Sequence, residues 1–182
     1  MADKNRTKRE ILATFFEVLR STPFEKITVK QLCEHAQISR QTFYQYFRDK
    51  YDVVEAVVGI VLQDNFQQLG KTIGWHGAYL NTFRQMEAMS DALRRIGTTG
   101  DYNSIDQMTT RSAFDDYMNR YRERYGEEPS EKLVFQMRWL AVAGTWAPYE
   151  WIQGGCTPPA ERFADMFVSL IPHELREALD VD

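Results

Sequence analysis

The sequence predicts an all-α protein that consists of an N-terminal three-helix domain and a C-terminal helical bundle. Apolar residues recur at helical spacing through almost every segment, and no alternating strand pattern extends beyond a few residues. Capping residues and Gly or Pro interruptions separate these segments. With 182 residues, of which 43% are hydrophobic, the chain can build one mid-sized domain or a small domain joined to a larger one.

Four helix starts are marked within the first fifty residues by side chains that can accept a hydrogen bond from a first-turn N–H. They are Thr7 with Glu10 three residues later, Thr28 with Gln31, Ser39 and Asp49. We therefore expect helices over residues 7–20, 29–36, 39–47 and 49–70. The Ser-Thr-Pro sequence at 21–23 ends the first of them, and residues 37 and 38 form the turn between the second and the third.

The rest of the chain is predicted to be helical as well, apart from three interruptions. These are the loop at 97–104, the break at Gly126 and Pro129, and the GGCTPP sequence at 154–159. The expected helices cover residues 74–89, 91–96, 105–125, 131–153, 160–170 and 172–179. We expect residues 1–51 to form one domain and residues 52–182 the other.

Charge is distributed unevenly between these two parts. The chain as a whole carries a formal charge of −4, but residues 1–50 carry +4 and the remaining residues carry −8. A basic head on an acidic body is the pattern expected when only the head meets a polyanion such as DNA.

Residues 38–50, ISRQTFYQYFRDK, place many long hydrogen-bonding side chains on one short helix. On a helical wheel, Phe43 and Phe47 fall in one narrow arc that can face a small core, while most other positions face outward. Two short capped helices joined by a tight turn, the second anchored by such a stripe, describe a helix-turn-helix. The second helix would enter the major groove, where Arg suits guanine and Gln suits adenine. The alternative is an ordinary solvated surface helix, which accounts less well for the caps and the stripe together.

The segment at 24–54 resembles the DNA-binding domain of the TetR family of bacterial transcriptional regulators. The matching residues are Ile27-Thr28, Ala36-Gln37-Ile38-Ser39, the TFYQYF block at 42–47 and Lys50. The resemblance covers about the first third of the chain. One position departs from the family pattern, because Gln37 stands where the family usually has the glycine of the turn. Since that position favours a positive φ, we expect backbone strain at Gln37 or a slightly different turn.

This resemblance implies a sequence-specific DNA-binding regulator and gives the residues of the head their roles. Thr28 and Lys30 would touch the DNA backbone or a base edge. The groove-facing residues would be Arg40, Gln41, Thr42 and Tyr44. Tyr46 and Lys50 would hold phosphates on either side. Further phosphate contacts could come from the start of the first helix, at Arg6, Lys8 and Arg9.

Residues 139–167 resemble, more loosely, a C-terminal regulatory domain found in part of the same family. There the last two long helices of each subunit pack as a four-helix dimer bundle. The small residues that would permit such an approach are Ala141, Ala143, Gly144 and Ala147, and the apolar area would come from residues such as Trp151, Ile152 and Phe167. The alternative is that all of these are monomer core. Because a single head reads too few base pairs for a specific operator, we expect a homodimer on a palindromic DNA site.

An effector pocket is expected between the middle helices, because ligand sites in helical bundles lie between helices. The aromatic residues that could line it are Trp75, Tyr79, Phe83, Phe114, Tyr117, Phe135 and Trp139. Each of them is equally well explained as ordinary core. The effector itself is a small molecule or a protein, since some relatives with this C-terminal domain act through a protein partner.

Other classes of function find no support in the sequence. No Gly-x-Ser-x-Gly, phosphate loop or dinucleotide fingerprint is present, so we expect neither an enzyme nor a cofactor. Cys33 and His35 point to different faces of one helix and have no second pair nearby, so we expect no metal site. No segment is apolar enough for a membrane span and the N-terminus has no apolar region typical of a signal peptide. We expect a cytoplasmic protein with reduced thiols.

Two hypotheses about the mode of regulation follow from the sequence. The first is a repressor that an effector releases from its operator. The second is a co-regulator that activates transcription through a protein partner and has no small-molecule ligand.

Overall fold

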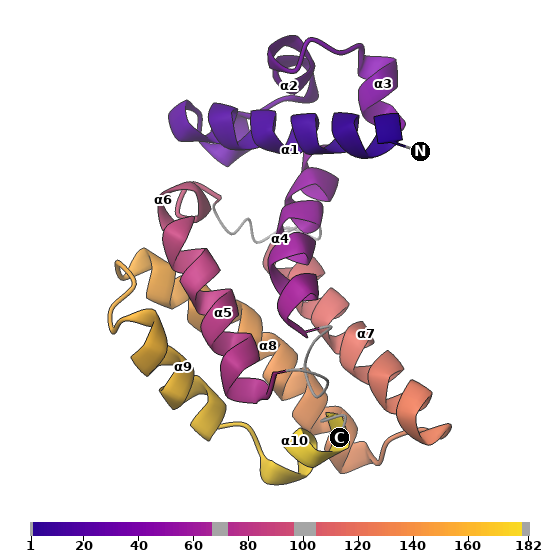
Figure 1. The fold of residues 1–182 in the computed structure, drawn as a ribbon, viewed down its shortest axis with the longest axis vertical. Coiled ribbons are helices and arrows are strands. Elements are labelled where there is room, and N and C mark those ends of the chain that lie inside the picture. The colour runs from indigo at the N-terminus through magenta and orange to yellow at the C-terminus, as the bar shows by residue number, and fades with distance from the viewer. Residues whose placement is uncertain (1, 67–72, 97–104, 180–182) are drawn as a thin grey trace. The chain divides into compact units, whose positions relative to one another are not determined.

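The computed structural model of the chain describes residues 2–66, 73–96 and 105–179. Within these ranges the chain is helical and contains no strand, which confirms the predicted all-α class (Figure 1). The N-terminal elements are α1 (Ala2–Ser21), the 3₁₀ helix η1 (Phe24–Lys26), α2 (Val29–His35), α3 (Arg40–Tyr44) and α4 (Lys50–Phe66). They are followed by α5 (Trp75–Ala88), α6 (Ser90–Leu93), α7 (Ile105–Tyr125), α8 (Glu131–Gln153), α9 (Ala160–Ser169) and α10 (His173–Leu179).

Most of the expected helices lie within a few residues of their predicted positions, but the predicted start of the first helix is wrong. α1 begins at Ala2, so Thr7 lies inside the helix and not at its cap. Arg6 and Glu10 form an ion pair of 2.8 Å one turn apart, and such a pair stabilises helix on both sides of Thr7. The predicted end of α4 at residue 70 and the loop at 97–104 lie outside the described residues.

The chain divides into two compact units, residues 1–60 with 91–105 and residues 61–90 with 106–182. The first unit therefore contains the head and a segment from the middle of the chain. The functional division that we expect after residue 51 falls inside α4 and stays a prediction.

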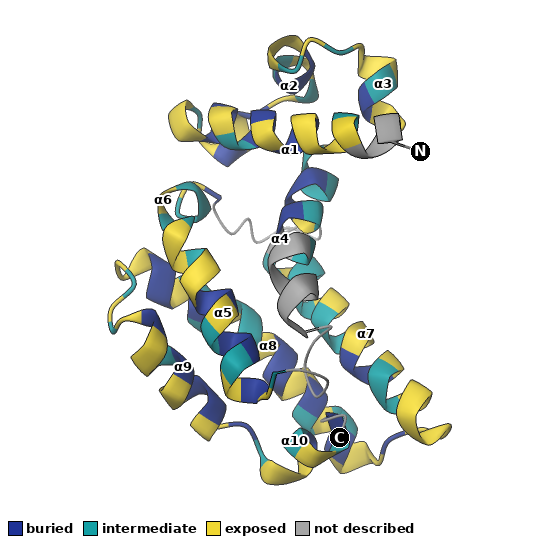
Figure 2. Cartoon of the chain, in the orientation of Figure 1, coloured by how far each residue is buried: buried dark blue, intermediate teal, exposed yellow. Residues whose placement is uncertain are grey.

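The core of the first unit is built from the apolar faces of α1 to α4. Phe15, Phe24 and Phe43 have no exposed surface there. The ring of Phe24 meets those of Phe15 and Tyr51 edge to face, with centroids 6.2 and 5.3 Å apart. Figure 2 shows how buried and exposed positions alternate along α1, as expected for an amphipathic helix. The backbone N–H of Phe24 also donates to the carbonyl of Arg95 at 3.3 Å, which joins the segment after α6 to this unit.

The second unit is organised around an aromatic cluster in which α5 packs along α9 (Figure 1). Tyr79 lies 4.6 Å from Phe167 between ring centroids, and Phe83 lies 4.7 Å from Phe163. From α8, the indole of Trp151 stacks on Phe163 at 4.7 Å with an angle of 4° between the planes. Such aromatic pairs contribute about 0.5–1.5 kcal/mol each beyond the burial of their area.

Candidate nucleic-acid interface

α2 and α3 are both started by the caps that the sequence predicts. The hydroxyl of Thr28 accepts from the backbone N–H of Gln31 at 3.2 Å, and that of Ser39 accepts from Thr42 N–H at 2.9 Å. Each cap satisfies one of the N–H groups that a helix leaves unpaired in its first turn. The two short helices therefore begin at positions fixed by local side chains.

The turn between these helices contains a residue in a left-handed conformation. Gln37 has φ of 53°, in the region that glycine adopts without steric cost. This confirms the expectation of a positive φ at the position where the family pattern has glycine. The next N–H, that of Ile38, donates to the carbonyl of Cys33 at 3.0 Å and closes the turn. The turn thus holds a non-glycine residue in a conformation that carries backbone strain.

α3 presents its polar side chains outward, as predicted. Phe43 is fully buried and Phe47, just beyond the helix, is nearly so, whereas Arg40, Gln41 and Tyr44 are exposed. The helix is shorter than expected, because it ends at Tyr44. Its apolar side faces the core of the first unit, so the exposed side chains form one outward surface, which we call the reading face.

Arg40 and Tyr44 lie one turn apart on the reading face and contact each other. The Nη2 of Arg40 donates to the Tyr44 hydroxyl at 3.2 Å, and its guanidinium carbon lies 5.9 Å from the centre of the tyrosine ring. This hydrogen bond raises the pKa of the Arg40 guanidinium above its ordinary value. The pair holds an arginine fork in an exposed position, and such a fork is suited to bidentate contact with a guanine edge.

The remaining predicted contact residues occupy different environments. Thr28 and Lys30 are exposed at the start of α2, and the Lys30 ammonium lies 3.8 Å from Glu34. Thr42 and Tyr46 are half-buried, and the Thr42 hydroxyl is 2.9 Å from that of Ser39. Their roles in DNA contact stay predictions, and Thr28 and Lys30 lie on α2 and its cap, not on the reading face.

Lys50, by contrast, points its ammonium group into the protein. Its Nζ donates to the carbonyl oxygens of Phe24, Glu25 and Ile27, at 2.9, 2.9 and 3.1 Å. The same nitrogen lies 4.6 Å from the centre of the Phe24 ring. An ammonium group has three N–H donors, so this arrangement uses all of them. In this conformation Lys50 offers no hydrogen bond to a phosphate, contrary to what the resemblance implies.

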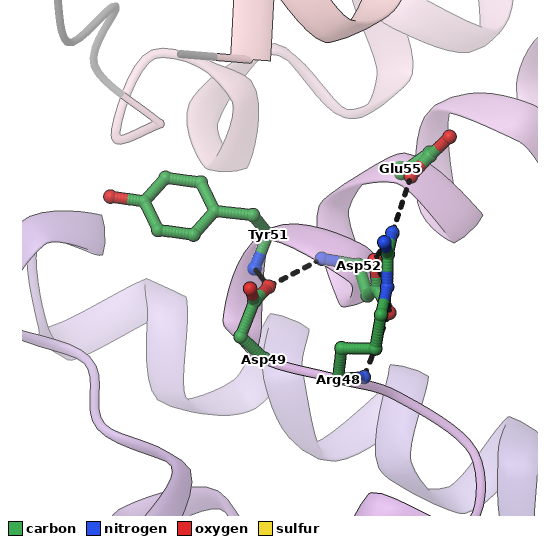
Figure 3. Close-up of polar contacts among 5 residues, drawn as sticks. All are labelled: Arg48, Asp49, Tyr51, Asp52 and Glu55. Carbon is green, nitrogen blue, oxygen red and sulfur yellow. Dashed lines mark hydrogen bonds and ion pairs between the residues drawn. The ribbon is translucent and has the colours of Figure 1, made fainter. Parts of the chain in front are cut away.

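A second cation at the junction of α3 and α4, the exposed Arg48, is paired with a carboxylate of the same chain (Figure 3). The backbone N–H of Arg48 donates to Asp52 at 2.7 Å, and its Nε donates to both carboxylate oxygens at 3.0 and 2.8 Å. These contacts lower the pKa of the Asp52 carboxyl, against the opposing effect of burial. The carboxylate of Asp49 caps α4 through the N–H groups of Tyr51 and Asp52, at 2.8 and 3.0 Å. Sequence reasoning missed the Arg48–Asp52 pair, although its four-residue spacing is a usable signal.

The residues proposed for an effector pocket differ in their burial, and their role in a pocket stays a prediction. Tyr79, Phe83 and Tyr117 are buried, the first two within the aromatic cluster, and burial raises the pKa of Tyr117 to about 12. Phe114 is half-buried beneath Arg138, whose guanidinium carbon lies 4.4 Å from the ring centre. The remaining three are Trp75, which is buried, and Phe135 and Trp139, which are exposed.

Trp75 lines a hollow of about 410 Å³ within the second unit, at the start of α5. Val168 and Arg176 contribute to the same hollow from α9 and α10. The Nε1 of Trp75 and the Nε of Arg176 are buried without a hydrogen-bond partner among the described residues. Both atoms are donors only, so each would need an acceptor to be satisfied.

The described part of α8 carries an exposed apolar stripe, which we call the α8 stripe. It consists of Phe135, Trp139, Val142 and Trp146, whose side chains are between 40% and 71% exposed. The spacing of four, three and four residues places them on one face of the helix. By contrast Trp151, Ile152 and Phe167, expected in a dimer seam or in the core, are buried within the chain itself.

The described residues also bear on metal binding, on the Cys33 thiol and on membrane insertion. No group of three His, Cys, Asp or Glu side chains there could hold a metal ion. Burial raises the pKa of the Cys33 thiol, which lies in the core of the head. In the same residue ranges, every helix is too short or too polar to cross a bilayer.

Comparison with known proteins agrees with the geometry of the head. Residues 11–57 match the family model of bacterial regulatory proteins, tetR family. No curated protein matches the sequence. Among solved structures, one described as dihydroxyacetone kinase operon activator DhaS is similar over 94% of this chain and 97% of that chain, with a TM-score of 0.58 and 18% sequence identity. At this level of identity the likeness concerns the fold alone.

Proposed function

We propose that this chain, a DNA-binding regulator of the tetR family, binds a palindromic operator as a homodimer. The observation that carries the proposal is the reading face. Arg40, Gln41 and Tyr44 are exposed together on a helix whose other side is anchored by the buried Phe43. Residues 1–51 act as the DNA-binding domain, and residues 52–182 hold the dimer together and receive the effector. A regulator of this kind acts in the cytoplasm, where its DNA is.

The homodimer is supported by the α8 stripe. Four large apolar side chains on one helix face are more than scattered exposure, and contiguous apolar patches on soluble proteins commonly mark interfaces. Trp and Phe are also among the residues enriched at the centres of such interfaces. At the end of α9, Met166 and the C-cap residue Leu170 are exposed and add to the apolar surface of the second unit.

Operator selection tests the proposal. The purified full-length protein is incubated with a random pool of duplex DNA, and the bound sequences are determined after several rounds. A consensus of two inverted half-sites, with centres about one helical turn or a multiple of it apart, is the expected result. A single half-site, or no enrichment at all, would contradict the homodimer or the DNA-binding function respectively.

Repression relieved by an effector is the mode of regulation that we propose first. The hollow beside Trp75 supports it, because a small molecule with an acceptor group could satisfy the indole N–H and the Nε of Arg176. A screen for compounds that release the selected operator, run on the wild-type protein and on Arg176→Gln, tests the site. We expect compounds that release the wild-type protein from the operator and that do not release the variant.

Activation through a protein partner is the second candidate, and one specific observation favours it. The similar solved structure is described as an operon activator. A gel shift with the purified protein alone separates the two candidates. Specific binding without any other protein supports the first, while binding that needs an added cell extract supports the second.

A further inference from the structure

Lys50 joins the two ends of the helix-turn-helix. Its backbone begins α4, directly after the reading helix and its turn, while its ammonium group holds the 3₁₀ helix that precedes α2. The contacts reach back 23 to 26 residues, from Lys50 to Ile27 and Phe24. The Lys50 side chain thus links the two ends of the segment that carries α2 and α3.

The geometry of this closure is specific to an ammonium group. Three carbonyl oxygens converge on Nζ, and the ring of Phe24 covers it at 4.6 Å, with that of Tyr51 at 5.6 Å. Carbonyls left without a donor in this half-buried place would lose hydrogen bonds, and the penalty of desolvation would remain. A planar guanidinium cannot point three donors at one small nest of carbonyls in the same way.

The Arg48–Asp52 ion pair lies at the same end of this segment, on either side of Lys50 in the sequence (Figure 3). The two cations that flank Asp49 are therefore both bound to groups of this chain, but the Arg48 side chain is 82% exposed and only the Lys50 ammonium turns into the protein. Lys30 differs from Lys50, because its side chain is 76% exposed and its ammonium lies at the longer distance of 3.8 Å from Glu34. A phosphate contact of the ordinary kind requires a cation whose donors can turn outward, as those of Lys30 can.

We propose that Lys50 is a positioning residue and not a phosphate ligand. It links the two ends of the helix-turn-helix segment and thereby orients the reading face. The proposal rests on the DNA-binding function proposed above. It predicts that Lys50 acts on the affinity for the specific operator and leaves the electrostatic part of binding unchanged. A phosphate ligand would do the reverse, since it contributes to every sequence alike.

The test compares Lys50→Arg and Lys50→Met with Lys30→Met as the matched control. The dissociation constant is measured over a range of salt concentrations, for the selected operator and for a duplex of random sequence. Folding of each variant is checked first by its thermal unfolding, and binding is measured well below the transition.

We expect Lys50→Met to bind the operator about ten-fold more weakly or worse, with an unchanged salt slope and unchanged binding to random DNA. Lys50→Arg, which keeps the charge but not the geometry, should lose specific affinity in the same way. Lys30→Met should lower the slope by about one unit and weaken binding to both duplexes.

The proposal is overturned if Lys50→Met lowers the salt slope by about one unit and weakens binding to both duplexes equally. It is also overturned if folded Lys50→Met binds the operator as the wild type does. Should Lys50→Met fail to fold, Lys50→Arg decides, because wild-type operator affinity in that variant is what a phosphate ligand predicts. If the wild type itself enriches no DNA sequence, the DNA-binding proposal fails and not the role of Lys50.

Discussion

Arg40 donates a hydrogen bond of 3.2 Å to the hydroxyl of Tyr44, one turn further along the reading helix. Both side chains are exposed, so without this bond the arginine would sample many rotamers. The tyrosine therefore restrains the guanidinium in the protein without DNA. Such preorganisation increases affinity by reducing the entropy lost on binding.

Removing Arg40 should relax the sequence preference of the protein. For Arg40→Ala we expect roughly ten- to hundred-fold less discrimination at one position of each half-site, because a bidentate contact to a base edge is lost. Tyr44→Phe removes only the supporting hydroxyl and should produce a smaller change at the same position. Binding to a panel of operators with single base changes measures both.

The effects of the two substitutions on base discrimination should also not be additive. If Tyr44 acts through Arg40, then Tyr44→Phe changes little in a protein that already lacks the arginine. Independent effects that sum in the double variant would show that Tyr44 contacts DNA by itself.

The turn at Gln37 gives a second prediction. Gln37→Gly should raise the free energy of unfolding by about 0.5 kcal/mol. The strain of the left-handed conformation is relieved, and this gain outweighs the larger conformational entropy that glycine loses on folding. Gln45→Gly is the matched control, since Gln45 is also exposed but has φ of −75°. There glycine should lower stability by about 0.5–1 kcal/mol. Denaturant unfolding of both variants measures the difference, and equal effects would contradict strain at Gln37.

Local features of the head were predictable from the sequence, because each depends on residues a few positions apart. The caps at Thr28, Ser39 and Asp49 and the inward stripe of Phe43 are of this kind. The partners of Lys50 lie 23 to 26 residues away. No local pattern distinguishes an ammonium that turns inward to such partners from one that turns outward to a phosphate.

The body was harder to predict for a related reason. α8 is apolar on more than one side, with Leu133, Met137 and Leu140 buried while Phe135 and Trp146 are exposed. Helical periodicity assigns residues to faces, but it does not say which of two apolar faces meets the chain's own core. The expected pocket residues Phe135 and Trp139 therefore lie on the surface, although their residue type is typical of an interior.

Asp52 gives a prediction about pH. Hydrogen bonds from the Arg48 side chain and backbone lower the pKa of its carboxyl in the folded protein. A lowered pKa stabilises the fold above the unfolded value of about 3.9, and this contribution is lost as the pH falls through the folded pKa. Asp52→Asn should therefore be less stable than wild type at neutral pH, and the difference should shrink below about pH 4.

Glu55 provides the control for that experiment. Its carboxylate lies 3.9 Å from the Arg48 Nη2 and is half exposed, so Glu55→Gln should change stability little at any pH. Thermal unfolding of the three proteins between pH 3 and pH 7 gives the comparison. A difference between wild type and Asp52→Asn that stays constant over this range would contradict the role given to the Asp52 carboxylate.

The α8 stripe gives the last prediction, which concerns the homodimer. Trp146 is 63% exposed at one end of the stripe, and a charge placed there would be buried unpaired in a dimer interface. Trp146→Glu should therefore yield a folded monomer that elutes later in size-exclusion chromatography and has the mass of one chain by light scattering. Its affinity for a palindromic operator should fall steeply, because the two half-sites are no longer bound by linked heads. Asn119→Glu adds the same charge to an exposed position on α7 and should leave the mass and the affinity unchanged. If Trp146→Glu remains dimeric, the subunits meet elsewhere and the stripe must be assigned to another partner.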